Sequence, residues 1–273
     1  NIGFHEQSGF KGHGDLFHGQ RQDHDPLFGN DLQKEIEGYL DRGFTAFKMK
    51  IGRTANNYKM RLQYMKNGDF YLTDEEDKAR IELVRRIIGP DKTLMVDMNC
   101  TWDVDDVLRA RSFFEKNDIF MIEEPIRSDD IAGYRHLTRE MGEIRVAGIE
   151  SEQGVSRFGE MLATDTMDVV QASLGWAGGF TGCRKIASTA QAFDKLYTPH
   201  SFFSAVMTAA NIQFAASQVN IPFIEAEENE NPLRTELLRA PIETDGHMNY
   251  LVTDKPGLGI ELNWDVVDKY MMH

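Results

Sequence analysis

The chain has little cysteine, a shortage of positive charge and no long apolar run, and each shortage excludes a class of protein. Its 273 residues include only two cysteines, Cys100 and Cys183, which stand in unrelated contexts and form no CxxC pair. This argues against a disulfide framework and a structural zinc site. No apolar stretch reaches membrane-spanning length, and the N-terminus lacks the pattern of a signal peptide. We therefore expect a cytoplasmic protein.

The charge balance narrows the choice of partners. Lys and Arg number 30 against 44 Asp and Glu, which gives a formal net charge of −14 at pH 7. Such a surface repels nucleic acid and anionic membranes, so we expect neither as a partner. The 41% of apolar residues is enough to fill one core of this size. We expect residues 1–273 to form a single catalytic barrel domain.

What the chain does have is a regular alternation of strand and helix patterns. The strand patterns lie at 2–5, 44–51, 94–98, 119–123, 145–150, 168–172, 196–199 and 222–226. The helical patterns lie at 31–42, 74–88, 104–116, 129–141, 153–163, 181–193 and 203–218. This alternation predicts an α/β fold with a parallel sheet, and eight strands predict a TIM-like barrel.

Three acidic residues, Asp97, Glu123 and Glu150, close three successive predicted strands at nearly equal intervals. The C-terminal ends of barrel strands ring a single mouth, so the three carboxylates can converge on one hard divalent cation. Oxygen-only ligands favour Mg²⁺, with Mn²⁺ as second choice, over Zn²⁺. An acidic residue at a strand end can instead cap the following helix. Three acidic residues at equivalent positions of three successive strands favour a metal site.

Lys48 and Lys50 stand two apart in one predicted strand, so their side chains share a face. Two neighbouring amines depress the pKa of at least one of them, and a lysine brought toward neutrality is a competent general base. Solvated lysines on an edge strand are the alternative, but the flanking Phe47 and Ile51 indicate a buried strand. His200 also ends a predicted strand and is the second acid/base candidate.

Two segments break the alternation. Residues 53–73 form a basic insertion at the expected mouth, where it could attract an anionic substrate. The alternatives are a solvent-exposed loop and a contact between subunits of an oligomer. Residues 1–30 are rich in Gly and contain His5, His13, His18 and His24. Their irregular spacing favours a flexible loop over a second metal site.

Several short motifs together resemble a known family. They are KMK at 48–50, VDMN at 96–99, IEEP at 122–125, AGIE at 147–150, GG at 178–179, PH at 199–200, FIE at 223–225 and the closing PGLGIEL. Their order and spacing resemble the enolase superfamily, and within it the mandelate racemase-like subgroup, over nearly the whole chain. The resemblance implies a (β/α)7β barrel, Mg²⁺ bound by Asp97, Glu123 and Glu150, and Lys50 and His200 as acid/base groups on opposite faces of the substrate.

The resemblance also implies a chemistry. Lys48 would hold the pKa of Lys50 down, and Asn99 and Glu225 would contact metal or substrate. The family removes the proton α to a carboxylate and forms an enediolate. Members with a Lys and a His in these places resemble acid-sugar dehydratases, so we expect a small sugar acid or hydroxy acid as substrate and a homo-oligomer. A racemase or epimerase, and a non-catalytic relative that binds metal or a sugar acid, are the alternatives.

Two departures from the family pattern matter. Ser173 stands where His-containing relatives carry an Asp that hydrogen-bonds the catalytic histidine. We therefore expect His200 to be less basic and better suited to act as a general acid, which favours dehydration over racemisation, and we expect Ser173 to face the substrate. The second departure is that no capping domain precedes Asn1. We expect a fragment of a longer protein, with a barrel whose own loops form the lid as the alternative.

Overall fold

The computed structural model describes residues 2–7, 26–52, 73–228 and 231–271. The histidines predicted to lie in an N-terminal loop, apart from His5, fall outside the described residues, as does the predicted insertion except for Thr73. In the part of the chain that is described, no helix is long and apolar enough to cross a membrane.

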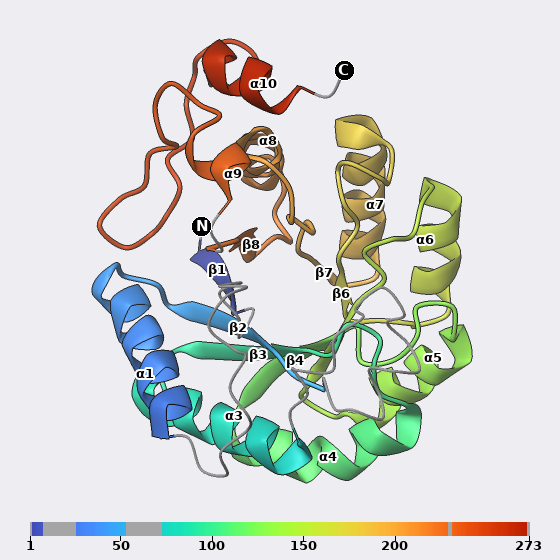
Figure 1. The fold of residues 1–273 in the computed structure, drawn as a ribbon. Coiled ribbons are helices and arrows are strands. Elements are labelled where there is room, and N and C mark those ends of the chain that lie inside the picture. The colour runs from blue at the N-terminus through green and yellow to red at the C-terminus, as the bar shows by residue number, and fades with distance from the viewer. Residues whose placement is uncertain (1, 8–25, 53–72, 229–230, 272–273) are drawn as a thin grey trace.

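Within the described residues, eight parallel strands form one sheet in the order β7-β6-β5-β4-β3-β2-β1-β8. Their bounds are β1 Ile2–Gln7, β2 Ala46–Lys50, β3 Thr93–Asp97, β4 Ile119–Glu123, β5 Arg145–Gly148, β6 Val169–Val170, β7 Leu196–Tyr197 and β8 Phe223–Ala226. The first strand in the sequence pairs with both β2 and β8, so the sheet curls round on itself (Figure 1). The predicted α/β barrel fold is confirmed.

The helices lie around the outside of the strands (Figure 1). They are α1 Pro26–Asp41, α3 Asp74–Ile88, α4 Val104–Lys116, α5 Ile131–Glu140, α6 Val155–Ala163, α7 Gly179–Ala192 and α8 Ala205–Ala216, followed by the short α9 Pro232–Thr235 and α10 Trp264–Tyr270. Thr73 and Glu76 form a capping box that begins α3, and Asp103 and Asp106 form another that begins α4. These caps satisfy backbone N–H groups that the first helical turn leaves without partners.

The described residues form three apolar clusters. The largest lies between the helices and the outer faces of the strands and contains Phe47, Val96 and Ile122. The smallest joins α8 to β8. The third is a plug inside the barrel, built by buried side chains from six strands: Ala46, Met95, Met121, Ala147, Val169 and Phe223. Because side chains alternate across a strand, the residues two positions further along five of these strands face inward directly above this plug.

Candidate active site

The residues directly above the apolar plug form a layer of polar side chains at the C-terminal ends of the strands. They are Lys48 on β2, Asp97 on β3, Glu123 on β4, Gln171 after β6 and Glu225 on β8, and each is buried. In a barrel this end is where active sites form. Five inward-facing polar groups in one layer make it the candidate site.

Lys48 lies at the centre of this layer. Its Nζ is 2.5 Å from Glu123 Oε1, 2.7 Å from Glu225 Oε1 and 3.8 Å from Asp97 Oδ2, and only 1% of its side chain is exposed. Three carboxylates therefore surround one ammonium group. The predicted same-face arrangement is confirmed, because the Nζ of Lys50 also contacts Asp97 Oδ2.

Lys50 stands one step nearer the mouth, with 11% of its side chain exposed. Its backbone carbonyl accepts a hydrogen bond of 3.1 Å from Arg80 Nη1 on α3, and the next residue, Ile51, donates to the carbonyl of Asp97 at 2.9 Å. These bonds fix the end of β2 between α3 and β3. The ammonium group of Lys50 is thus held on a rigid element at the edge of the polar layer.

The buried carboxylates differ in their proton affinity. Burial alone would raise the pKa of Asp97, but the charges of Lys50 and Lys48 outweigh it and hold that pKa below its ordinary value. Burial raises the pKa of Glu123 well above its ordinary value, and although Lys48 opposes the rise, the charges of Asp97 and Glu225 add to it. Glu123 is therefore the carboxyl of this pair that holds a proton more readily.

Two polar residues around Glu123 were not among the predicted site residues. Gln171 Nε2 donates to Glu123 Oε2 at 2.5 Å, and Gln171 is only 1% exposed. The pKa of Glu124 is raised to about 7 by burial first and then by the charges of Glu150 and Asp97. Gln171 could have been found from the sequence, because it stands two residues after an inward-facing valine of β6. Glu124 lies within the IEEP motif at 122–125, but the motif alone predicted no role for it.

His200 lies between two carboxylates. Its Nδ1 is 2.9 Å from Glu150 Oε2 and 3.4 Å from Glu225 Oε2. Burial alone would lower the pKa of His200, but the charges of Glu225 and Glu150 raise it from 6.5 to about 9. The expectation that the absence of an Asp at position 173 would leave His200 less basic is therefore wrong, because other carboxylates take the place of that partner. These two carboxylates therefore favour the protonated imidazole in the metal-free protein.

The other predicted substrate-binding residues have defined places. Ser173 is fully buried, and its Oγ accepts a hydrogen bond of 3.2 Å from the N–H of Gly175, within the loop after β6. Both oxygens of Glu225 are engaged, Oε1 by Lys48 and Oε2 by the N–H of Ser201 at 2.5 Å. Asn99 donates its N–H to Asp97 Oδ1 at 2.8 Å. Their contact with a substrate stays a prediction.

The strand ends near the site leave regular geometry. Asn99, Cys100, Glu124 and Ile149 have positive φ angles of 45°, 63°, 38° and 64°. Such values are uncommon for residues other than glycine and cluster at functional sites. Glu150 stands three positions after the inward-facing Ala147, so regular alternation would turn it away from the barrel interior. The turn at Gly148, with φ 142°, and Ile149 brings its carboxylate beside His200 instead.

The donor chemistry of the three predicted ligands fits a hard divalent cation. Asp97, Glu123 and Glu150 offer only carboxylate oxygens from three neighbouring strands, and Asp97 and Glu123 are hydrogen-bonded to each other. Among the described residues, no group of three or more His, Cys, Asp and Glu side chains is arranged to hold a metal ion. Glu150 is directed toward His200 instead. The three-ligand Mg²⁺ site stays a prediction.

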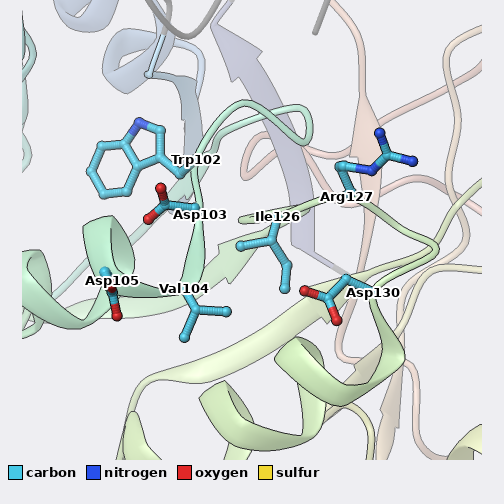
Figure 2. A pocket seen from close by; sticks show the side chains of 7 residues that line it. All are labelled: Trp102, Asp103, Val104, Asp105, Ile126, Arg127 and Asp130. Atoms are coloured by element: carbon cyan, nitrogen blue, oxygen red, sulfur yellow. The ribbon is translucent and has the colours of Figure 1, made fainter. Parts of the chain in front are cut away.

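A cavity of about 320 Å³ lies between the loops that follow β3 and β4 (Figure 2). It is lined by Trp102, Asp103, Val104, Asp105, Ile126, Arg127 and Asp130. None of the predicted acid/base or metal-binding residues lines this cavity. We therefore assign the candidate active site to the polar layer, where the titratable groups converge, and not to this cavity.

Comparison with known proteins identifies the relatives of the chain. The family model described as "Enolase C-terminal domain-like" matches residues 31–266. An arabinonate dehydratase of Saccharolobus solfataricus is 29% identical over 88% of this chain and 58% of its own length. A D-galactarolactone cycloisomerase of Agrobacterium fabrum is 34% identical over 89% of this chain and 61% of its own length. The chain thus spans less than two thirds of either relative.

A solved structure agrees with these matches. The crystal structure of a racemase from Streptomyces coelicolor A3(2) with bound magnesium superposes with a TM-score of 0.73 at 26% identity. The alignment covers 88% of this chain and 59% of the racemase chain. The magnesium ion in that structure is bound by the racemase, so it describes that protein and not this chain.

Proposed function

The chain belongs to the enolase C-terminal domain-like family, and from this premise we propose that it removes the proton α to the carboxylate of a sugar acid and eliminates the β-hydroxyl as water. The observation that carries this proposal is the pair of ion-paired cations, Lys50 on β2 and His200 after β7. Strands β2 and β7 are separated by β1 and β8 on one side and by β3 to β6 on the other, so these groups reach the mouth from different sides.

Each residue has a proposed task in this reaction. Lys50, held at the end of β2, takes the α-proton once its ammonium group has lost its own. Lys48, buried among carboxylates, fixes Glu123 and Glu225 and compensates their charge. His200, whose pKa the charge of Glu225 raises from the other side as well, delivers its proton to the departing β-hydroxyl. A charged imidazolium is a proton donor, so we place dehydration ahead of racemisation.

A divalent cation fits the donor set of Asp97, Glu123 and Glu150. When bound it would supply positive charge to the substrate carboxylate as the α-proton leaves, and Mg²⁺, or Mn²⁺ in second place, is the proposed ion. The Streptomyces racemase with bound magnesium supports this choice. The proposed substrate class, a small sugar acid, rests on the names of the two curated relatives.

A screen for dehydration tests the proposal. Purified protein with Mg²⁺ would be incubated with hexarates, hexonates and pentonates, and 2-keto-3-deoxy products would be detected by a colour reaction and NMR. We expect one group of stereochemically related acids to lose water, and we expect His200→Asn to form no product. Dehydration by His200→Asn at the wild-type rate would show that another group is the acid. Interconversion of two epimers without loss of water would favour racemisation.

A second candidate shares the first step. If the β-oxygen is the ring oxygen of a cyclic substrate, its departure opens the ring, and the proton from His200 completes an isomerisation in which no water is lost. The observation that favours this candidate is the 34% identity to a D-galactarolactone cycloisomerase over 89% of this chain. Product mass separates the two candidates, since dehydration lowers it by one water and isomerisation leaves it unchanged.

A further inference from the structure

Trp176 is a feature of the mouth to which the proposed reaction gives no task. It lies in the loop between β6 and α7, on the side of the barrel where the strands end, and 40% of it is exposed. Its indole stacks on the imidazole of His200, with ring centroids 5.8 Å apart and 25° between the planes. An exposed aromatic surface therefore adjoins the proposed proton donor.

The loop that carries Trp176 is held in place by Ser173. The carbonyl of Ser173 accepts hydrogen bonds from the N–H of Trp176 at 3.2 Å and of Ala177 at 2.8 Å, in addition to the bond between its Oγ and Gly175. A Cβ on Gly175 would lie 3.2 Å from Met207 Cε, which is a tight contact, and 3.6 Å from the ring of Phe203, which is an ordinary one. Position 173 thus forms a turn that presents an indole to His200.

Phe203 completes the aromatic side of the mouth. Its ring meets the indole of Trp176 edge-on at 5.5 Å and the imidazole of His200 at 6.0 Å. The preceding residue, Phe202, is 52% exposed. The opposite side, at the ends of β2 to β4, consists of Lys48, Lys50 and buried carboxylates. A ligand in this mouth therefore meets Lys50 on one side and, on the other, His200 with the aromatic rings that pack on it.

We propose that Trp176 forms an aromatic subsite that binds the ring of a ring-closed sugar acid, such as a lactone, in preference to the open chain. A sugar ring presents several C–H groups on one face, and their positive edges match the negative face of an indole. An open-chain polyhydroxy acid distributes its hydroxyls around a flexible backbone and loses more rotational freedom when it is ordered. The proposal rests on the proposed function, since it names the form of substrate that the same site takes.

Binding measurements with a matched pair of ligands test the proposal. D-galactaro-1,4-lactone and D-galactonate each carry one free carboxylate on a six-carbon chain, and only the first is ring-closed. Their dissociation constants would be measured by NMR titration on wild type, Trp176→Ala and Trp176→Phe. The control is Trp264→Ala, because Trp264 is 58% exposed on α10, outside the loops of the mouth. Far-UV and near-UV circular dichroism would confirm that each variant is folded.

We expect wild type to prefer the lactone by about tenfold, the size of one aromatic contact. Trp176→Ala should abolish most of this preference, Trp176→Phe should retain most of it because a flat ring remains, and Trp264→Ala should leave it unchanged. A wild type without preference, or a preference that survives in Trp176→Ala, would overturn the proposal.

Exchange of the α-proton of each ligand in D₂O separates this proposal from the proposed function. Selective lactone binding without α-proton exchange from any sugar acid would refute the proposed chemistry and leave the aromatic subsite in place. Exchange without ring selectivity would refute the subsite and leave the chemistry in place.

Discussion

Lys48 contributes to stability as well as to the electrostatics of the site. It is 1% exposed and lies within 2.7 Å of two carboxylates, so its removal would leave buried negative charge without compensation. We expect Lys48→Met to lower the free energy of unfolding by about 3–5 kcal/mol, the range for breaking a buried ion pair. Urea denaturation measures this loss.

The matched control is Lys116→Met. Lys116 pairs with Glu82 at 3.0 Å, but 71% of its side chain is exposed, and exposed pairs contribute little. We expect a change within about 0.5 kcal/mol. A loss for Lys48→Met as small as that of the control would contradict the central position of this lysine.

His200 makes the stability of the metal-free protein depend on pH. Its pKa is raised from 6.5 to about 9, so its contribution to stability is fully present below pH 6.5 and is lost as pH rises to about 9. Glu150→Gln removes one of the two causes of the rise. In chelator-treated protein, NMR titration should therefore give a lower pKa for His200 in this variant. An unchanged pKa would show that Glu150 does not act on the imidazole.

At the residue scale the structure brings several predicted site residues together at the strand ends, while their roles stay predictions. Alternation along a strand predicted that Lys48 and Lys50 share a face, and the place of Asp97 and Glu123 at strand ends predicted that they reach the mouth. It could not foresee that Glu150 would turn toward His200, because that follows from backbone angles at Gly148 and Ile149. A positive φ at a β-branched residue leaves no signal in the sequence.

At the scale of elements, capping residues decided how well boundaries could be predicted. Helices α3 and α4 begin and end where predicted, at 74–88 and 104–116, because Thr73 and Asp103 mark their starts. Helix α7 begins two residues before the predicted 181, since Gly178 at φ 99° is its N-cap and offers no side chain as a signal. Strand β6 covers only 169–170 of the predicted 168–172, because the chain leaves the sheet to form the loop that carries Trp176.

Replacing a glycine by alanine should have opposite effects on stability at two helical positions. A Cβ on Gly182, in the first turn of α7, would lie 2.3 Å from the carbonyl oxygen of Ala177, whereas a Cβ on Gly159 in α6 would meet nothing within 4 Å. We expect Gly182→Ala to destabilise the protein by about 1–3 kcal/mol through strain in the loop before α7. Gly159→Ala should stabilise it by about 0.5–1 kcal/mol, the gain in helix propensity.

Thermal unfolding of the two variants measures the difference. If Gly182→Ala unfolded at the wild-type temperature, the contact between α7 and the preceding loop would not be tight. In that case the position of Trp176 would also be less strictly fixed than the hydrogen bonds of its turn indicate.

At the scale of the whole molecule, the chain combines a net charge of −14 with a mouth in which cations and carboxylates alternate. A divalent cation would add positive charge where the negative charges are densest. We expect Mg²⁺ to raise the melting temperature of wild type, since a ligand that binds only the folded state stabilises it. Glu150→Gln should weaken Mg²⁺ binding at least tenfold by calorimetry.

The control for that experiment is Glu152→Gln. Glu152 lies two residues further on and pairs with Arg157 at 3.2 Å, away from the polar layer. We expect the Glu152→Gln variant to bind Mg²⁺ with the affinity of wild type. Equal affinity in Glu150→Gln and Glu152→Gln would show that Glu150 is not the third ligand.

Exchange of the α-proton with solvent is the most direct measurement of the central claim, which is that Lys50 removes this proton. Sugar acids would be incubated in D₂O with Mg²⁺ and wild type, Lys50→Met, His200→Asn or the control Lys78→Met, an exposed lysine of α3. NMR should show deuterium at C2 with wild type and Lys78→Met, none with Lys50→Met, and partial exchange without dehydrated product with His200→Asn. Exchange by Lys50→Met at the wild-type rate would contradict the claim.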